Sequence, residues 1–174
     1  CDEPKKPPKA PGTGIGRESG TWGRAHTERG WRVIPGMTAC VTVPVHTVID
    51  SPVGPLTAVA EGEALTGLYF ARHRRRHRLP DVGPLVEPGE LFRAMESQLR
   101  DYFAGRRREF DVPLAPRGDA FSQSVWALLR GIPYGGTRSY GQLAQALGRR
   151  GAAQSVGAAN GANPISIIVP CHRV

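Results

Sequence analysis

The chain has 174 residues, enough for one ordinary domain or two small ones, and no apolar run in it approaches the length that spans a membrane. Apolar residues make up 40% of the sequence, so the chain can bury a core. The formal net charge of +8 favours a polyanionic partner such as nucleic acid.

The excess of basic over acidic residues is most pronounced at the C-terminal end. Residues 119–174 contain one acidic residue, Asp119, against five arginines. Such a segment has almost no negative charge to repel a phosphate backbone.

The three cysteines are Cys1, Cys40 and Cys171. An odd and sparse set argues against a disulfide framework and for a reducing compartment. Because no signal-peptide pattern opens the chain, we expect a cytoplasmic location.

Residues 1–36 contain five prolines and seven glycines, a composition that predicts disorder. Regular patterning begins only after Met37, so we expect the folded unit to start near it. A functional basic tail is the alternative interpretation.

Residues 37–116 are expected to form an α/β domain in which an antiparallel meander is followed by a helix. Strands are predicted at residues 41–46, 56–60, 64–70 and 110–114. A helix is predicted from about 90 to 104. Its apolar stripe is expected to consist of Leu91, Met95, Leu99, Tyr102 and Phe103.

Residues 72–78 read Arg-His-Arg-Arg-Arg-His-Arg, which we interpret as a solvated basic loop, with phosphate contact as the alternative. His73 and His77 are four residues apart, and Cys40 and His46 lie upstream. A zinc site is conceivable there, but the sequence has no Cys-x-x-Cys pair and the strand and loop context is not that of a zinc finger. We therefore expect no metal and no cofactor.

Residues 116–118 read as a linker, and we place a domain boundary there, with residues 117–174 forming a mainly helical second domain. Asp119 is a predicted helix cap, and Ser139 with Gln142 fits a capping box. Helices are predicted at residues 119–131, 139–147 and 152–161. The last two, joined by a short glycine-containing turn, indicate a helix-turn-helix, although many helical hairpins bind no DNA.

The predicted helix at 152–161 is thin, because Gly157, Ala158, Ala159 and Gly161 carry little or no side chain. A thin helix can approach a nucleic-acid backbone and enter a narrow groove. Close packing against another helix explains the same residues without DNA.

The last twelve residues hold the candidate chemistry. Residues 165–169 are apolar and predict a buried strand, which Pro170 ends because it has no N–H to donate. Cys171 and His172 follow, and a thiol beside an imidazole supports nucleophilic catalysis. A small core cysteine is the alternative. Neighbours in an extended segment point to opposite faces, so contact between the two needs a bend or a bridging water.

Together these residues resemble the methylated-DNA–protein-cysteine methyltransferases, which repair 6-O-alkylguanine. The resemblance runs from about Thr47 to Val174 and is strong from Phe121 onward. The matching stretches are Phe121–Trp126, Ile132–Thr137, Ser139–Ala144, Val156–Gly161, Asn163–Pro164 and Ile168–Val174, the last with the specific Pro-Cys-His-Arg-Val signature. The resemblance implies a ribonuclease-H-like N-terminal domain and a winged-helix-like C-terminal domain.

The resemblance also implies a reaction. The thiolate of Cys171 would attack the alkyl carbon on the guanine oxygen and keep the group as a thioether, so each molecule acts once. The target base would be flipped out of the duplex. His172 would activate the thiol through a water molecule, and the partner would be double-stranded DNA carrying the lesion, bound by a monomer and drawing the protein to the nucleoid.

Further roles follow from the same resemblance. Tyr140 would press on the phosphate beside the target nucleotide, and Asn163 and Pro170 would shape the turn before the cysteine. An aromatic core residue and an ordinary turn former are the alternatives for Tyr140 and Asn163. The residues expected to bind DNA are Ser139, Tyr140, Gln154, Gly157, Ala158, Gly161 and Arg173.

The sequence departs from the family at two places. Gln154 occupies the position of an arginine finger, so we expect weaker DNA binding or slower base flipping. The chain also stops at Val174, before the family's glycine-rich loop, glutamate and final helix, which suggests a C-terminally incomplete chain. The alternative function is therefore a DNA- or lesion-binding protein without transfer activity; a cysteine hydrolase is disfavoured because no oxyanion motif is present.

Overall fold

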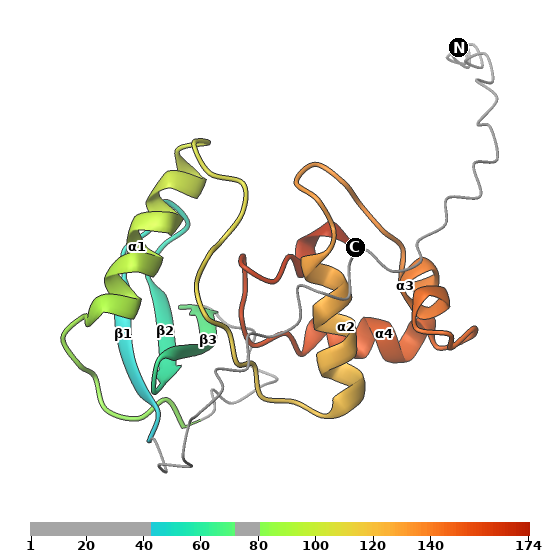
Figure 1. The fold of residues 1–174 in the computed structure, drawn as a ribbon, viewed down its shortest axis with the longest axis horizontal. Coiled ribbons are helices and arrows are strands. Elements are labelled where there is room, and N and C mark those ends of the chain that lie inside the picture. The colour runs from blue at the N-terminus through green and yellow to red at the C-terminus, as the bar shows by residue number, and fades with distance from the viewer. Residues whose placement is uncertain (1–42, 72–80) are drawn as a thin grey trace, which may run out of the picture.

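A computed structural model of the chain describes residues 43–71 and 81–174 (Figure 1). The predictions for residues 1–36, for Cys40 and for the arginine-histidine segment 72–78 lie outside these described residues. Within the described ranges, no helix is both long enough and apolar enough to cross a membrane.

Within residues 43–71, three antiparallel strands form the N-terminal sheet in the order β1-β2-β3, which confirms the predicted meander. Their bounds are Val45–Ile49 for β1, Leu56–Glu61 for β2 and Ala64–Phe70 for β3. The first strand begins later than expected, at Val45, because Val43 is exposed and Pro44 has no N–H for a ladder. The inward face of β1 is carried by Thr47 and Ile49, which are buried.

The sheet is covered by α1, Glu90–Phe103, which lies along it in Figure 1. Its buried residues are Phe92, Met95 and Leu99, which fall on one face at helical spacing. The prediction omitted Phe92 and instead placed Tyr102 in the stripe. Tyr102 points to an aromatic group at the helix end, with its ring centroid 5.1 Å from that of Phe110.

The strand predicted at residues 110–114 is wrong, because only Leu114 pairs, as an isolated parallel bridge to Leu65. The Leu65 N–H donates to the Pro113 carbonyl at 2.9 Å, and the Ala115 N–H donates to the Leu65 carbonyl at 2.8 Å. Pro113 and Pro116 have no N–H, so the segment cannot extend a ladder in either direction.

The C-terminal part consists of three helices packed through α4. Their bounds are Ala120–Arg130 for α2, Tyr140–Ala146 for α3 and Ala153–Gly161 for α4. Both predicted caps are confirmed, since Asp119 accepts from the Ser122 N–H at 2.7 Å and Ser139 with Gln142 forms a complete capping box. The indole N–H of the buried Trp126 donates to the carbonyl of Ala159 at 2.8 Å and joins α2 to α4.

The strand predicted at residues 165–169 is also wrong, although its burial was predicted correctly. Ile165 makes one isolated bridge to Leu68 of β3, with the Leu68 N–H donating to the Pro164 carbonyl at 2.8 Å and the Ser166 N–H donating to the Leu68 carbonyl at 3.1 Å. The chain then turns through Ile167, whose φ is 70°, and ends in a short 3-10 helix, η1, Cys171–Arg173. Figure 1 shows this last segment lying between the sheet and α2.

Candidate active site and nucleic-acid interface

Cys171 is the first residue of η1, and its side chain is partly exposed. Its N–H donates to the Val169 carbonyl at 2.8 Å, and its own carbonyl accepts from the Asn160 side-chain amide at 3.3 Å. Both backbone polar groups are therefore engaged. The thiol is partly accessible on a backbone held from two sides, as a nucleophile requires.

His172 follows in the same turn, with its imidazole accessible at the surface. Partial burial lowers the pKa of His172 below its usual 6.5, and the positive charge of Arg173 lowers it further. The ring is therefore neutral near pH 7 and can accept a proton. In a 3-10 turn successive side chains lie about a third of a turn apart, so a bridging water suits this pair better than direct contact.

Asn163 is buried, with 5% of its surface exposed, and it organises the turn that leads to the cysteine. Its side-chain amide donates to the carbonyls of Val169, at 2.8 Å, and Ile165, at 3.3 Å. Its oxygen accepts from the Ile165 N–H at 3.0 Å. One side chain thus takes hydrogen bonds that a strand would have made with a neighbour, which explains why residues 165–169 fold as a turn.

Asn160, near the end of α4, was missed by the sequence analysis. Its amide nitrogen lies 3.3 Å from the Cys171 carbonyl and 3.5 Å from the Tyr140 hydroxyl, so it joins α4 to both α3 and η1. The available signal was a polar residue four positions after Val156, on the inward face that α4 otherwise forms from Val156 and Ala159.

Tyr140 opens α3 and is 38% exposed, so its ring forms part of the surface. The ring lies against Gly157 of α4, where an added Cβ would sit 3.2 Å from Cε2 of Tyr140. Gly157 therefore permits the close approach of the tyrosine ring. The absence of a side chain at Gly157 thus serves a contact within the protein.

The outer face of α4 carries exposed Gln154, Ala158 and Gly161, at helical spacing. It is flat and uncharged, and the turn before it carries exposed Arg149 and Arg150. A flat helix beside exposed arginines can lie against a phosphate backbone.

Two residues predicted to bind DNA have partners inside the protein. The Ser139 hydroxyl accepts from the Gln142 N–H as a helix cap. The guanidinium of Arg173 donates to the Ile132 carbonyl at 2.8 Å and lies over the ring of Tyr134, 5.4 Å from its centroid. Ser139 and Arg173 therefore have structural roles in addition to any contact with DNA.

No group of three or more His, Cys, Asp or Glu side chains that could hold a metal occurs in residues 43–71 and 81–174. Of the four residues weighed for zinc, only His46 is described, and its Nδ1 lies 2.9 Å from the Gly83 carbonyl. His46 is thus already engaged with the backbone.

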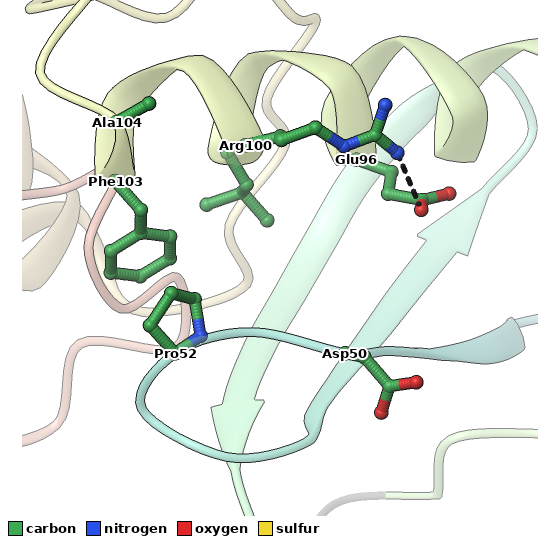
Figure 2. A pocket seen from close by; sticks show the side chains of 7 residues that line it. Asp50, Pro52, Glu96, Arg100, Phe103 and Ala104 are labelled. Atoms are coloured by element: carbon green, nitrogen blue, oxygen red, sulfur yellow. Dashed lines mark hydrogen bonds and ion pairs between the residues drawn. The ribbon is translucent and has the colours of Figure 1, made fainter.

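A hollow of about 260 Å³ lies on the N-terminal part, between α1 and the β1–β2 turn (Figure 2). Asp50, Pro52 and Phe103 line it, together with an ion pair between Arg100 and Glu96 at 3.1 Å. It holds no nucleophile, and none of its lining residues belongs to the segment that carries Cys171.

Two family models match this chain. Residues 45–116 match the model described as "6-O-methylguanine DNA methyltransferase, ribonuclease-like domain". Residues 120–174 match the model described as "6-O-methylguanine DNA methyltransferase, DNA binding domain".

Curated relatives and solved structures agree with these models. The chain is 45% identical over 129 residues to a methylated-DNA–protein-cysteine methyltransferase of Methanosarcina acetivorans, covering 74% of this chain and 81% of the relative. It is 50% identical over 133 residues to the protein of that name from Mycobacterium tuberculosis, covering 74% and 76%. The crystal structure of the M. tuberculosis O6-methylguanine methyltransferase aligns with a TM-score of 0.67 at 48% identity, covering 76% of this chain and 78% of that one. A crystal structure of the M. tuberculosis OGT in complex with DNA aligns with a TM-score of 0.65 at 49% identity, covering 75% and 77%.

Proposed function

The chain belongs to the 6-O-methylguanine DNA methyltransferase family, and we propose that Cys171 is the residue that receives the alkyl group. Proteins of this family repair DNA by moving an alkyl group from guanine to a cysteine of their own chain. The observation that carries the assignment is the position of Cys171: a partly exposed thiol on a turn whose backbone is fixed by Val169 and Asn160.

The transfer is a displacement at the alkyl carbon. The sulfur electron pair of Cys171 forms the new S–C bond while the C–O bond to guanine breaks and its electron pair stays on the guanine oxygen. The thiol proton leaves through water to the neutral imidazole of His172, and guanine takes one proton at N1 as it is released. The balance is one thiol and one 6-O-methylguanine in, and one thioether and one guanine out, so a second turnover is not possible.

The proposed DNA-binding surface is the outer face of α4, with Tyr140 beside it. Gln154, Ala158 and Gly161 are exposed there, and Gly157 lets the tyrosine ring approach the helix closely. Because a base in a stacked duplex hides its alkyl group from the thiol, the target nucleotide must rotate out of the helix. In this proposal Tyr140 presses on the adjacent phosphate, and Asn163 and Pro170 hold the turn that presents Cys171.

We propose a boundary between two domains near residue 117, with the N-terminal domain over 37–116 and the DNA-binding domain over 117–174. The two family models, at 45–116 and 120–174, support this division. Since the substrate is chromosomal DNA, we also propose that the protein works in the cytoplasm, at the nucleoid, as a monomer.

The test is intact mass after incubation with a duplex containing one 6-O-methylguanine. We expect a gain of one methyl group that peptide mapping assigns to Cys171, with the chain's other two cysteines, Cys1 and Cys40, serving as internal thiol controls. An unmodified duplex should give no gain, and neither should Cys171→Ala. A gain that persists in Cys171→Ala would refute the assignment. Binding to the damaged duplex with no gain at any cysteine would instead favour a lesion-binding protein without transfer activity.

A further inference from the structure

Asn160 is a buried amide whose hydrogen bonds are only partly satisfied. It is 9% exposed, and its oxygen has no hydrogen-bond partner among the described residues. An unsatisfied buried polar atom costs stability, and this cost offsets what Asn160 gains by donating to the Cys171 carbonyl. Net stability therefore gives little reason for an asparagine here, whereas the placement of its nitrogen does.

The orientation of this amide is set by its neighbours. The nitrogen lies 3.3 Å from the carbonyl oxygen of Cys171, which can only accept a hydrogen bond. Exchanging the nitrogen and oxygen of Asn160 would bring two acceptors together, so the nitrogen must face Cys171. The same nitrogen lies 3.5 Å from the Tyr140 hydroxyl, which must therefore accept from it.

The Tyr140 hydroxyl has a proton that Asn160 does not use. A phenol that accepts from Asn160 keeps its own O–H proton free to donate elsewhere. Its side chain is 38% exposed, on the surface beside the outer face of α4. The free proton is therefore available to an acceptor atom of the target nucleotide.

We propose that Asn160 is a positioning residue that couples Tyr140 to Cys171: one amide holds the cysteine carbonyl and directs the tyrosine proton toward the target nucleotide. The inference rests on the proposed function, because it requires transfer to Cys171. Both contacts are long, and hydrogen bonds of catalytic sites are often long before substrate binds and shorten in the complex. The amide oxygen has no partner because both hydrogen bonds that orient the Asn160 side chain are donated by its nitrogen.

The test is a double-mutant cycle on the intact chain, with Asn160→Leu, Tyr140→Phe and the pair. The measurement is the single-turnover rate of methyl transfer against the concentration of damaged duplex, which separates the saturating rate from the half-saturating concentration. We expect each single variant to lower the saturating rate by about tenfold, as the loss of one aligned hydrogen bond does, with little change in half-saturation. The double variant should be within about threefold of the slower single variant, because Asn160 acts through Tyr140.

Two further variants separate this role from a structural one. Asn160→Leu should melt within about 4 °C of the wild type, because the unsatisfied oxygen that it removes offsets the lost hydrogen bond to the Cys171 carbonyl. Asn160→Asp should transfer more slowly than Asn160→Leu, because a carboxylate accepts the hydrogen bond that the Tyr140 hydroxyl would otherwise donate to the nucleotide, and it repels the Cys171 carbonyl. Gln145→Leu is the matched control. Gln145 is exposed on α3 and lies five residues after Tyr140, so its side chain points away from that tyrosine, and the variant should transfer at the wild-type rate.

Wild-type transfer by Asn160→Leu would overturn the proposal, as would rate losses that multiply in the double variant. Failure of the proposed function gives a different result, because the wild-type protein would then gain no methyl group at Cys171.

Discussion

Replacing Asn163 with alanine tests the turn that presents the cysteine. The change removes the three hydrogen bonds that its side chain makes to the backbone of Ile165 and Val169. The Val169 carbonyl keeps the Cys171 N–H, at 2.8 Å, and the Ile165 carbonyl keeps the Val169 N–H, at 3.0 Å. Only the N–H of Ile165, a fully buried residue, is left without its partner.

The expected loss of stability follows from this count. Three hydrogen bonds at a net value of about 1 kcal/mol each give a loss of about 3 kcal/mol. In a protein of this size, 1 kcal/mol shifts the melting temperature by roughly 2–4 °C, so Asn163→Ala should melt about 9 °C below the wild type. Methyl transfer should slow as well, because the same turn holds the backbone of Cys171.

The assay is thermal unfolding by circular dichroism, with single-turnover transfer measured well below the transition. Gln145→Ala, which truncates an exposed amide on α3, is the control and should melt within about 1 °C of the wild type. A fall of less than about 2 °C for Asn163→Ala would refute the reasoning, because the turn would then be held by something other than this side chain.

Three more predictions concern DNA binding and pH. Gln154→Arg should tighten DNA binding and steepen the slope of log affinity against log salt by about 1, whereas Gln145→Arg, which adds the same charge on another helix, should change the slope less. Gly157→Ala should slow transfer without lowering the melting temperature: its Cβ, 3.2 Å from Cε2 of Tyr140, displaces the ring, while alanine favours the helix by up to about 1 kcal/mol. A wild-type rate in that variant would show that the ring position is unimportant. Because partial burial lowers the pKa of His172 from 6.5, the unfolded chain binds its proton more readily, so the contribution of His172 to stability is lost as pH falls below about 6.5. Transfer should slow over the lower part of that range, as the folded imidazole becomes protonated, and a pH–rate profile that stays flat down to pH 5 would contradict the role of His172 as the base.

Local chemistry was enough to predict much of the fold. The caps at Asp119 and Ser139 depend on residues within three positions of each other, and the structure contains both. The meander also depends on short turns between neighbouring strands, as in the residues between β2 and β3. Such features are readable from the sequence because each involves only nearby residues.

The errors involve hydrogen-bond partners that the pattern of apolar residues does not reveal. Ile165 and Val169 look like a strand because they are apolar, but the side chain of Asn163 takes hydrogen bonds that a strand would need. Likewise, Leu114 pairs with Leu65 as a single bridge flanked by prolines. The role of Asn160 could not be predicted, because its contacts with Tyr140 and Cys171 exist only once three elements pack together.

The bridge between Leu68 and Ile165 has a consequence for the order of folding. It joins the last strand of the N-terminal sheet to the segment before the cysteine, through hydrogen bonds from the N–H groups of Leu68 and Ser166. Contacts between residues so far apart in sequence carry a large loop-closure entropy, and proteins that depend on them fold slowly. A nascent chain therefore carries its thiol on an unformed turn until the sheet is in place. The protein acquires its nucleophile in working geometry only as folding is completed, and the exchange rates of these two amide protons should report that moment.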